Sequence, residues 1–211
     1  VKACGAGGGT GNHGVPARAL RDLCMGLVQA FPAERGRLMG ALPRDGAMMA
    51  VHADEARVGA ILGPWRHEVA IAAVNGPQSV VVSGRATAVE AVADALRFEG
   101  IAITPLRVSH AFHSPLVEPM LAEFARAAKR VRYAAPAVDL VSNVTGGLAD
   151  AGIAAAEYWG THVRAPVRFE AGVRTLVQSG CDALLEVGPH PTLLGMAREC
   201  HSFDAMPCLP S

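Results

Sequence analysis

The chain has 211 residues, of which 51% are hydrophobic and 18% charged, and its formal net charge is +0 at pH 7. This composition supports a sizeable core, of one domain or of one domain with a small subdomain, and excludes intrinsic disorder. The neutral balance and the lack of any run of about 18 apolar residues indicate no nucleic-acid partner and no membrane partner. Five widely spaced cysteines without a C-x-x-C pair, and no leader-like start, favour a reduced, cytoplasmic setting.

Residues 1–32 form an atypical start. Residues 1–16 are glycine-rich and indicate a loop. Residues 17–30 place leucines and a valine at helical spacing, which predicts a helix. Pro32 lacks the N–H that a helix interior needs, so we expect it to end this helix or to begin a new one that continues past residue 33.

Short strands and helices alternate over residues 46–108. The expected elements are a strand at 47–53, a helix at 54–62 begun by Asp54, two strands around the turn Asn75-Gly76-Pro77, a helix at 87–99 and a strand at 101–108. Thr87 and Glu90 have the spacing of a capping box, and Gly100 suits the end of that helix. The order β-α-β-β-α-β predicts a ferredoxin-like arrangement.

Helices and buried strands alternate again over residues 109–211. Ser114 followed by Pro115 is typical of a helix N-terminus. We then expect a buried strand at 137–146, a helix at 169–180, and a strand, a turn and a helix within 181–200. This alternation predicts an α/β fold in which helices cover a parallel sheet.

Two histidines, His110 and His113, stand where a strand gives way to a helix. Side chains at such edges face the crevice in which open α/β sheets bind ligands. An imidazole there can act as a general base, because its ordinary pKa of about 6.5 lies near working pH. A purely structural pair is the alternative. A metal site would need a third ligand nearby, and the sequence offers none, so we expect no metal.

Other polar residues have simple structural interpretations. Asn75 fits a turn, and His162 and Arg164 fit an exposed loop. Arg35 fits a solvated helix face, although an arginine facing a cleft would suit a carboxylate. The tract Gly9-x-Gly11-x-x-Gly14 matches a dinucleotide fingerprint in form, but no strand precedes it, so we expect no NAD(P) binding.

Seven motifs in order resemble the acyltransferase domain of modular type I polyketide synthases, which is similar to malonyl-CoA:acyl-carrier-protein transacylases. They are "ERGRLMGALP", "GAMMAV", "AAVNGPQSVVVSG", "VSHAFHSPLVEPMLAEF", "LVSNVTGGLAD", "YWGTHVRAPVRF" and "LLEVGPHPTLLG", and they span roughly residues 33–198. The resemblance implies a large α/β-hydrolase-like subdomain, incomplete here, from residues 33–45 and 109–211. Residues 46–108 would form the inserted ferredoxin-like subdomain.

The resemblance also implies a reaction and its partners. A serine takes a malonyl unit from coenzyme A, and the phosphopantetheine thiol of an acyl carrier protein then collects it. The covalent intermediate divides one difficult step into two easier ones. No further cofactor is implied, and a ketosynthase would be the neighbouring domain of the synthase.

Site residues follow from the same motifs. His113 matches the catalytic histidine, and the backbone carbonyl of His162 would orient its ring. Arg35 matches the arginine that holds the free carboxylate, and Asn75 a supporting residue at the subdomain junction. Phe112 would form a pocket wall, with His110 shaping it, which disfavours a methyl branch on the substrate.

The chain departs from the family at the nucleophile. The family has G-H-S-x-G at a strand-to-helix turn, and no such pentapeptide occurs in these residues. The family interval before Arg35 falls near Thr10, which lacks the flanking pattern. A truncated chain with a scrambled or frame-shifted start would explain this, and a catalytically inactive remnant that only docks partners is the alternative to an active acyltransferase.

Overall fold

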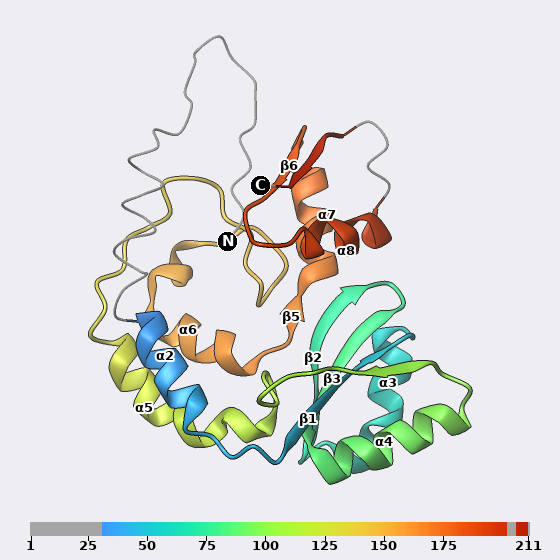
Figure 1. The fold of residues 1–211 in the computed structure, drawn as a ribbon. Helices are drawn as coiled ribbons and strands as arrows, with labels where there is room; N and C mark the ends of the chain where they lie inside the picture. Colours follow the sequence, from blue (N-terminus) through green and yellow to red (C-terminus); the bar gives the residue numbers. More distant parts are fainter. Residues whose placement is uncertain (1–30, 202–205, 211) are drawn as a thin grey trace.

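The largest sheet in the computed structural model has five strands in the order β4-β1-β3-β2-β5 (Figure 1). The structure describes residues 31–201 and 206–210, so the loop and helix predicted within residues 1–30 lie outside it. The strands are β1 (Gly46–Val51), β2 (Val69–Gly76), β3 (Ser79–Arg85), β4 (Ile103–Pro105) and β5 (Val167–Arg168). The first four pair antiparallel, and β5 joins β2 in parallel.

Two helices cover one face of this sheet, α3 (Glu55–Ile61) and α4 (Ala86–Phe98) (Figure 1). Because side chains alternate along a strand, Val80 and Val82 of β3 pack in the cluster with these helices, whereas Val81 packs on the other face. The predicted order β-α-β-β-α-β is therefore confirmed, with the strand interleaving of a ferredoxin-like unit.

The predicted capping box of α4 is wrong. The helix begins at Ala86, directly after β3, and no side chain caps it, so Thr87 already lies in the first turn. The Ala86 N–H instead donates to the backbone carbonyl of Asp45 at 2.9 Å, which satisfies one of the free N–H groups of the first turn. Gly100 has a φ of +70°, as expected of a residue that ends a helix.

A second group of helices packs away from the sheet. It consists of α2 (Phe31–Gly40), α5 (Glu118–Ala128) and α6 (Ala156–Arg164), and Figure 1 shows α2 beside α5. Ser114 caps the 3-10 turn Pro115–Val117 that leads into α5, since its Oγ accepts the Leu116 N–H at 3.2 Å. The expected helix start at Ser114 is thus confirmed, with one 3-10 turn before the α-helix.

The C-terminal part contains a parallel pair of strands against two helices. The elements are α7 (Phe169–Gln178), β6 (Leu184–Glu186), α8 (Thr192–Cys200) and β7 (Cys208–Pro210). The helices and the strand predicted within residues 169–200 are confirmed, and the fold is α/β. Cys181 is disulfide-bonded, against the expected reduced state, while the thiol of Cys208 is free.

The strand predicted at 137–146 is wrong. This segment forms one isolated bridge, between Val141 and Leu148. Ser142 explains why, because its Oγ accepts the backbone N–H groups of Val144 at 3.1 Å and Thr145 at 3.3 Å. Such local bonds turn the chain and compete with a strand ladder.

No helix among residues 31–201 and 206–210 is long and apolar enough to cross a membrane.

Candidate active site

A buried apolar cluster holds α2, α5 and α6 together. Its central members are Leu38 of α2, Phe124 of α5 and Val163 of α6, all nearly or fully inaccessible to solvent. Arg35 lies one turn before Leu38, and His162 is the neighbour of Val163. Packing of these three helices therefore brings together site residues that are far apart in the sequence.

His113 has an unusual backbone conformation. Its φ is +57°, and it is the one non-glycine residue with a positive φ in the described part of the chain. The left-handed region costs an ordinary residue about 1–2 kcal/mol, so surrounding contacts must hold it. One such contact joins His113 Nδ1 to the carbonyl oxygen of Ala165 at 2.8 Å. With Nδ1–H as the donor, Nε2 is left as the basic nitrogen of the neutral ring.

The carbonyl that orients His113 belongs to Ala165 and not, as expected, to His162. The reason lies in the end of α6, whose final helical residue is Arg164. Carbonyls inside a helix point along its axis, whereas Ala165 at the C-cap is extended, with φ −70° and ψ 152°. Its carbonyl is therefore free to accept a bond from a neighbouring segment.

His162 contributes its ring rather than its carbonyl. The ring centroids of His113 and His162 lie 6.4 Å apart, with an interplanar angle of 68°. The ring centroids of Tyr158 and Trp159 lie 6.0 and 5.6 Å from that of His162. The expected exposed loop around His162 and Arg164 is wrong, since both residues lie on α6 and are only partly exposed.

The site keeps its histidines neutral. Burial lowers the pKa of His113 below 6.5, the cations of Arg35 and Arg164 lower it further, and the bond to Ala165 opposes them. Burial, followed by the charges of Arg35 and His113, lowers the pKa of His162 to about 4. A neutral imidazole is the form that a general base needs.

Arg35 is an available cation beside these histidines. Its side chain is half-buried, and burial lowers the pKa of its guanidinium, which nevertheless stays charged. Within the described residues, no salt bridge joins Arg35 to an acidic side chain, whereas Arg37 two residues later pairs with Glu34 and Glu123. Among residues 31–201 and 206–210, no acidic side chain thus competes for Arg35, whose guanidinium could bind an anion.

His110 and Phe112 lie beside the sheet. The His110 side chain is buried, its Nδ1 lies 3.0 Å from Ser109 Oγ, and its ring centroid is 6.1 Å from that of Phe112. Phe112 packs against Met48 and Val81 on the sheet face opposite the helices. The two residues are therefore neighbours, as a shared pocket wall would require.

Asn75 does not join the histidines in any described contact. It lies inside β2 rather than in the turn, which Pro77 and Gln78 form. Its backbone carbonyl is 3.0 Å from Cys200 Sγ, a contact that links β2 to α8. Asn75 thus lies at a junction between the five-stranded sheet and the C-terminal helices.

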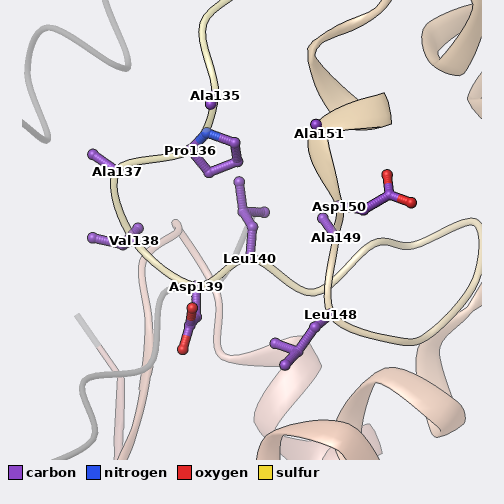
Figure 2. A pocket seen from close by; sticks show the side chains of 10 residues that line it. All are labelled: Ala135, Pro136, Ala137, Val138, Asp139, Leu140, Leu148, Ala149, Asp150 and Ala151. Carbon is purple, nitrogen blue, oxygen red and sulfur yellow. The ribbon is translucent and has the colours of Figure 1, made fainter.

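A separate cavity lies away from these residues. It has a volume of about 300 Å³ and lies between the segments 135–140 and 148–151, which face each other in Figure 2. None of its lining residues is one of the predicted site residues. Within the described residues, no group of three potential metal ligands occurs.

His162 should make stability depend on pH. Its pKa is about 4 in the folded chain and near 6.5 when unfolded, so the unfolded chain binds more protons between these values. The folded chain is therefore most stable above pH 6.5. Its free energy of unfolding falls by about 2 kcal/mol as the pH falls towards 4, after allowance for the partial exposure of His162. In urea unfolding at several pH values, His162→Leu should flatten this dependence. His67→Leu, at an exposed position, is the control, and an unchanged slope in His162→Leu would contradict the expectation.

Sequence reasoning missed two site residues, Arg164 and Ala165. Arg164 was assigned to a solvated loop, and alanine offers no chemical signal at all. The helical spacing of Tyr158, Trp159 and His162 indicates a helix, and that helix could be expected to end close to His162.

Comparison with known proteins assigns the family. The model of the acyl transferase domain family matches residues 28–207. The phenolphthiocerol synthesis polyketide synthase type I Pks15/1 of Mycobacterium bovis is 52% identical over 161 residues, which cover 76% of this chain and 8% of that protein. The spectinabilin polyketide synthase system protein NorB of Streptomyces orinoci is 44% identical over 189 residues, which cover 89% of this chain and 8% of that protein.

Solved structures agree. The acyltransferase domain from the second module of the salinomycin polyketide synthase superposes with a TM-score of 0.83 at 46% identity, covering 86% of this chain and 42% of that one. A malonyl-CoA:acyl carrier protein transacylase of Xanthomonas oryzae gives a TM-score of 0.75 at 26% identity, covering 83% and 57%. The chain thus spans a tenth or less of these curated relatives and about half of the solved domains. The family model nonetheless matches well over half of this chain, at residues 28–207, and the chain belongs to the acyltransferase domain family found in modular polyketide synthases.

Proposed function

We propose that this chain provides the base and the carboxylate-binding group for transfer of a malonyl unit from coenzyme A to an acyl carrier protein. The observation that carries the proposal is the placement of His113, whose Nδ1 is engaged by Ala165 at 2.8 Å while Arg35 lies near enough to lower its pKa. A ketosynthase would be a neighbouring domain in the same synthase, and the synthase would be cytoplasmic. The proposed reaction uses no metal or further cofactor.

His113 acts in both half-reactions. Its Nε2 takes the proton of the attacking hydroxyl as the oxygen bonds to the thioester carbon, and the coenzyme A sulfur leaves with that proton. The phosphopantetheine thiol then gives its proton to Nε2 and attacks the acyl ester, and the hydroxyl regains a proton. The Ala165 carbonyl stabilises the charged ring in each step by accepting from Nδ1–H. Arg35 holds the malonyl carboxylate through charge-assisted hydrogen bonds.

The attacking hydroxyl is not assigned to a residue of this chain. The sequence has no G-H-S-x-G pentapeptide, and Thr10 lies outside the described residues. Intact-mass measurement of the 211-residue chain after mixing with malonyl-CoA would reveal any covalent adduct. Peptide mapping of such an adduct would identify its nucleophile.

A chimera tests the proposal itself. Residues 33–198 would replace the matching part of a polyketide synthase acyltransferase domain that supplies G-H-S-x-G. We expect the chimera to move malonyl from malonyl-CoA to a phosphopantetheinylated carrier protein, as measured by the mass of the carrier. A folded chimera that moves no malonyl, beside an active parent domain, would overturn the proposal.

Phe112 should set the choice between malonyl and methylmalonyl units. A phenyl wall leaves little room for a methyl branch, and one methyl group is worth about 1–3 kcal/mol in such a pocket. Phe112→Ser in the chimera should therefore raise the methylmalonyl-to-malonyl ratio of kcat/KM roughly tenfold. Phe98→Ser is a matched control, because Phe98 is 91% exposed at the end of α4. Equal ratios in the two variants would exclude Phe112 from the wall.

A further inference from the structure

Two contacts side by side join the segment that carries His113 to the end of α6. The first is the hydrogen bond between His113 Nδ1 and the Ala165 carbonyl, at 2.8 Å. The second is an ion pair in which Arg164 Nε donates to the Glu118 carboxylate at 3.0 Å. Arg164 directly precedes Ala165, and Glu118 follows His113 after one 3-10 turn. We call these two contacts together the α6 clamp.

The strained backbone of His113 explains why a second contact matters. A φ of +57° is unfavourable for histidine, so this segment gains by relaxing unless its surroundings prevent it. The apolar cluster packs α5 against α6, and the hydrogen bond to Ala165 fixes one atom of the His113 ring. A second polar contact a few residues away further restrains the two segments where the ring is held.

The ion pair is poorly suited to a purely stabilising role. Its side chains are 33% and 56% exposed, and pairs in such contact with water add little to folding stability. Of the other pairs, Arg97 with Asp94 lies within one helix and Arg37 with Glu123 joins α2 to α5. The pair of Glu118 and Arg164 instead joins α5 to α6 beside the proposed base.

We infer that Glu118 and Arg164 are a positioning pair, which holds the His113 imidazole in its hydrogen bond with Ala165 and so presents Nε2 to the reacting groups. The role of His113 in transfer rests on the proposed function, whereas the clamp itself does not. Neither residue need touch the substrate for this effect, because a small misplacement of a catalytic group is enough to slow a reaction.

Charged and titratable groups near His113 come from all three helices that pack together here. Arg35 lies on α2, His162 and Arg164 on α6, and Glu118 at the start of α5. Loss of the Arg164 cation removes one cause of the low pKa of His113. Loss of the Glu118 carboxylate leaves that cation in place but frees its side chain. Arg164→Gln and Glu118→Gln therefore change the charge near His113 differently, although both remove the ion pair. The effect of charge and the effect of losing the pair can thus be measured separately.

Nuclear magnetic resonance of the 211-residue chain with labelled histidine rings provides the test. Nitrogen shifts report which ring nitrogen of His113 carries the proton. In the wild-type chain we expect Nδ1–H to dominate. Arg164→Gln and Glu118→Gln should each lower the ratio of Nδ1–H to Nε2–H by about 2- to 10-fold, as expected from weakening one hydrogen bond. Arg97→Gln is the control and should leave the ratio unchanged.

Titration of the same samples adds a second readout. A weaker bond to Ala165 lowers the pKa of His113 in both variants, but only Arg164→Gln also removes a nearby cation, so its His113 should keep a higher pKa than that of Glu118→Gln. The exchange Glu118→Arg with Arg164→Glu should restore the wild-type nitrogen ratio while raising the pKa of His113, because a carboxylate then stands near the ring. Should Arg164→Gln unfold the chain, Arg164→Lys keeps the charge and should give an intermediate ratio.

Failure of the clamp and failure of the proposed function are distinguishable. A nitrogen ratio equal to that of Arg97→Gln in both Arg164→Gln and Glu118→Gln would overturn the clamp, whatever the activity. Shifted ratios in the 211-residue chain, together with a chimera that transfers no malonyl, would confirm the clamp and overturn the proposed function.

Discussion

Replacing His113 by asparagine is expected to lower malonyl transfer by the chimera about 10²- to 10⁴-fold, the range usually contributed by a general base. Asparagine adopts positive φ more readily than other residues, so the backbone at this position should keep its conformation. It offers no basic nitrogen, and both half-reactions should slow together. The measurement is kcat/KM for malonyl-CoA, with carrier-protein mass as the readout.

The control for this variant is His67→Asn, because His67 is exposed on the five-stranded part of the chain. Its kcat/KM should equal that of the unmodified chimera. Circular dichroism should show the same helix content in both variants. Undiminished transfer by His113→Asn would remove the base from the proposed mechanism.

The pH profile of the chimera provides an independent check on His113. A base must be unprotonated to act, so kcat/KM should rise with pH through the pKa of His113 and then level off. Since burial, Arg35 and Arg164 lower that pKa, the midpoint should lie below pH 6.5. A midpoint above 6.5 would show that a different group titrates.

Replacing Arg35 by glutamine should lower kcat/KM for malonyl-CoA by roughly 10- to 100-fold, because a charge-assisted hydrogen bond to a carboxylate is worth about 1.5–3 kcal/mol. Acetyl-CoA has no free carboxylate, so its slow transfer should not fall. Discrimination between the two substrates should therefore shrink. Loss of the Arg35 cation should also raise the pKa of His113 and move the acid limb of the profile to higher pH.

Arg37→Gln is the matched control for Arg35. It lies on the same helix two residues later, but its guanidinium is occupied by Glu34 and Glu123 at the surface. We expect it to leave both substrate discrimination and the acid limb unchanged. Equal losses for malonyl-CoA and acetyl-CoA in Arg35→Gln would indicate a structural role for Arg35 instead of carboxylate binding.

Local sequence was sufficient for most of the elements and for the family. Alternating apolar residues set the strands around residues 46–108, and Gly100 and Gly180, both at positive φ, end helices where they were expected to. The seven ordered motifs were enough to indicate the family. These features depend on neighbours within a few positions along the chain, and that is the range over which propensities and caps act.

Contacts between distant segments determined the features that local sequence did not predict. The backbone carbonyl of Asp45, far from α4 in the sequence, accepts from the first turn of that helix, where Thr87 was expected to provide the cap. The left-handed backbone of His113 and its bond to Ala165 exist because α2, α5 and α6 share one apolar cluster. No pattern within either segment encodes that bond, since its acceptor is a backbone carbonyl, present in every residue, whose direction is set by where a packed helix ends.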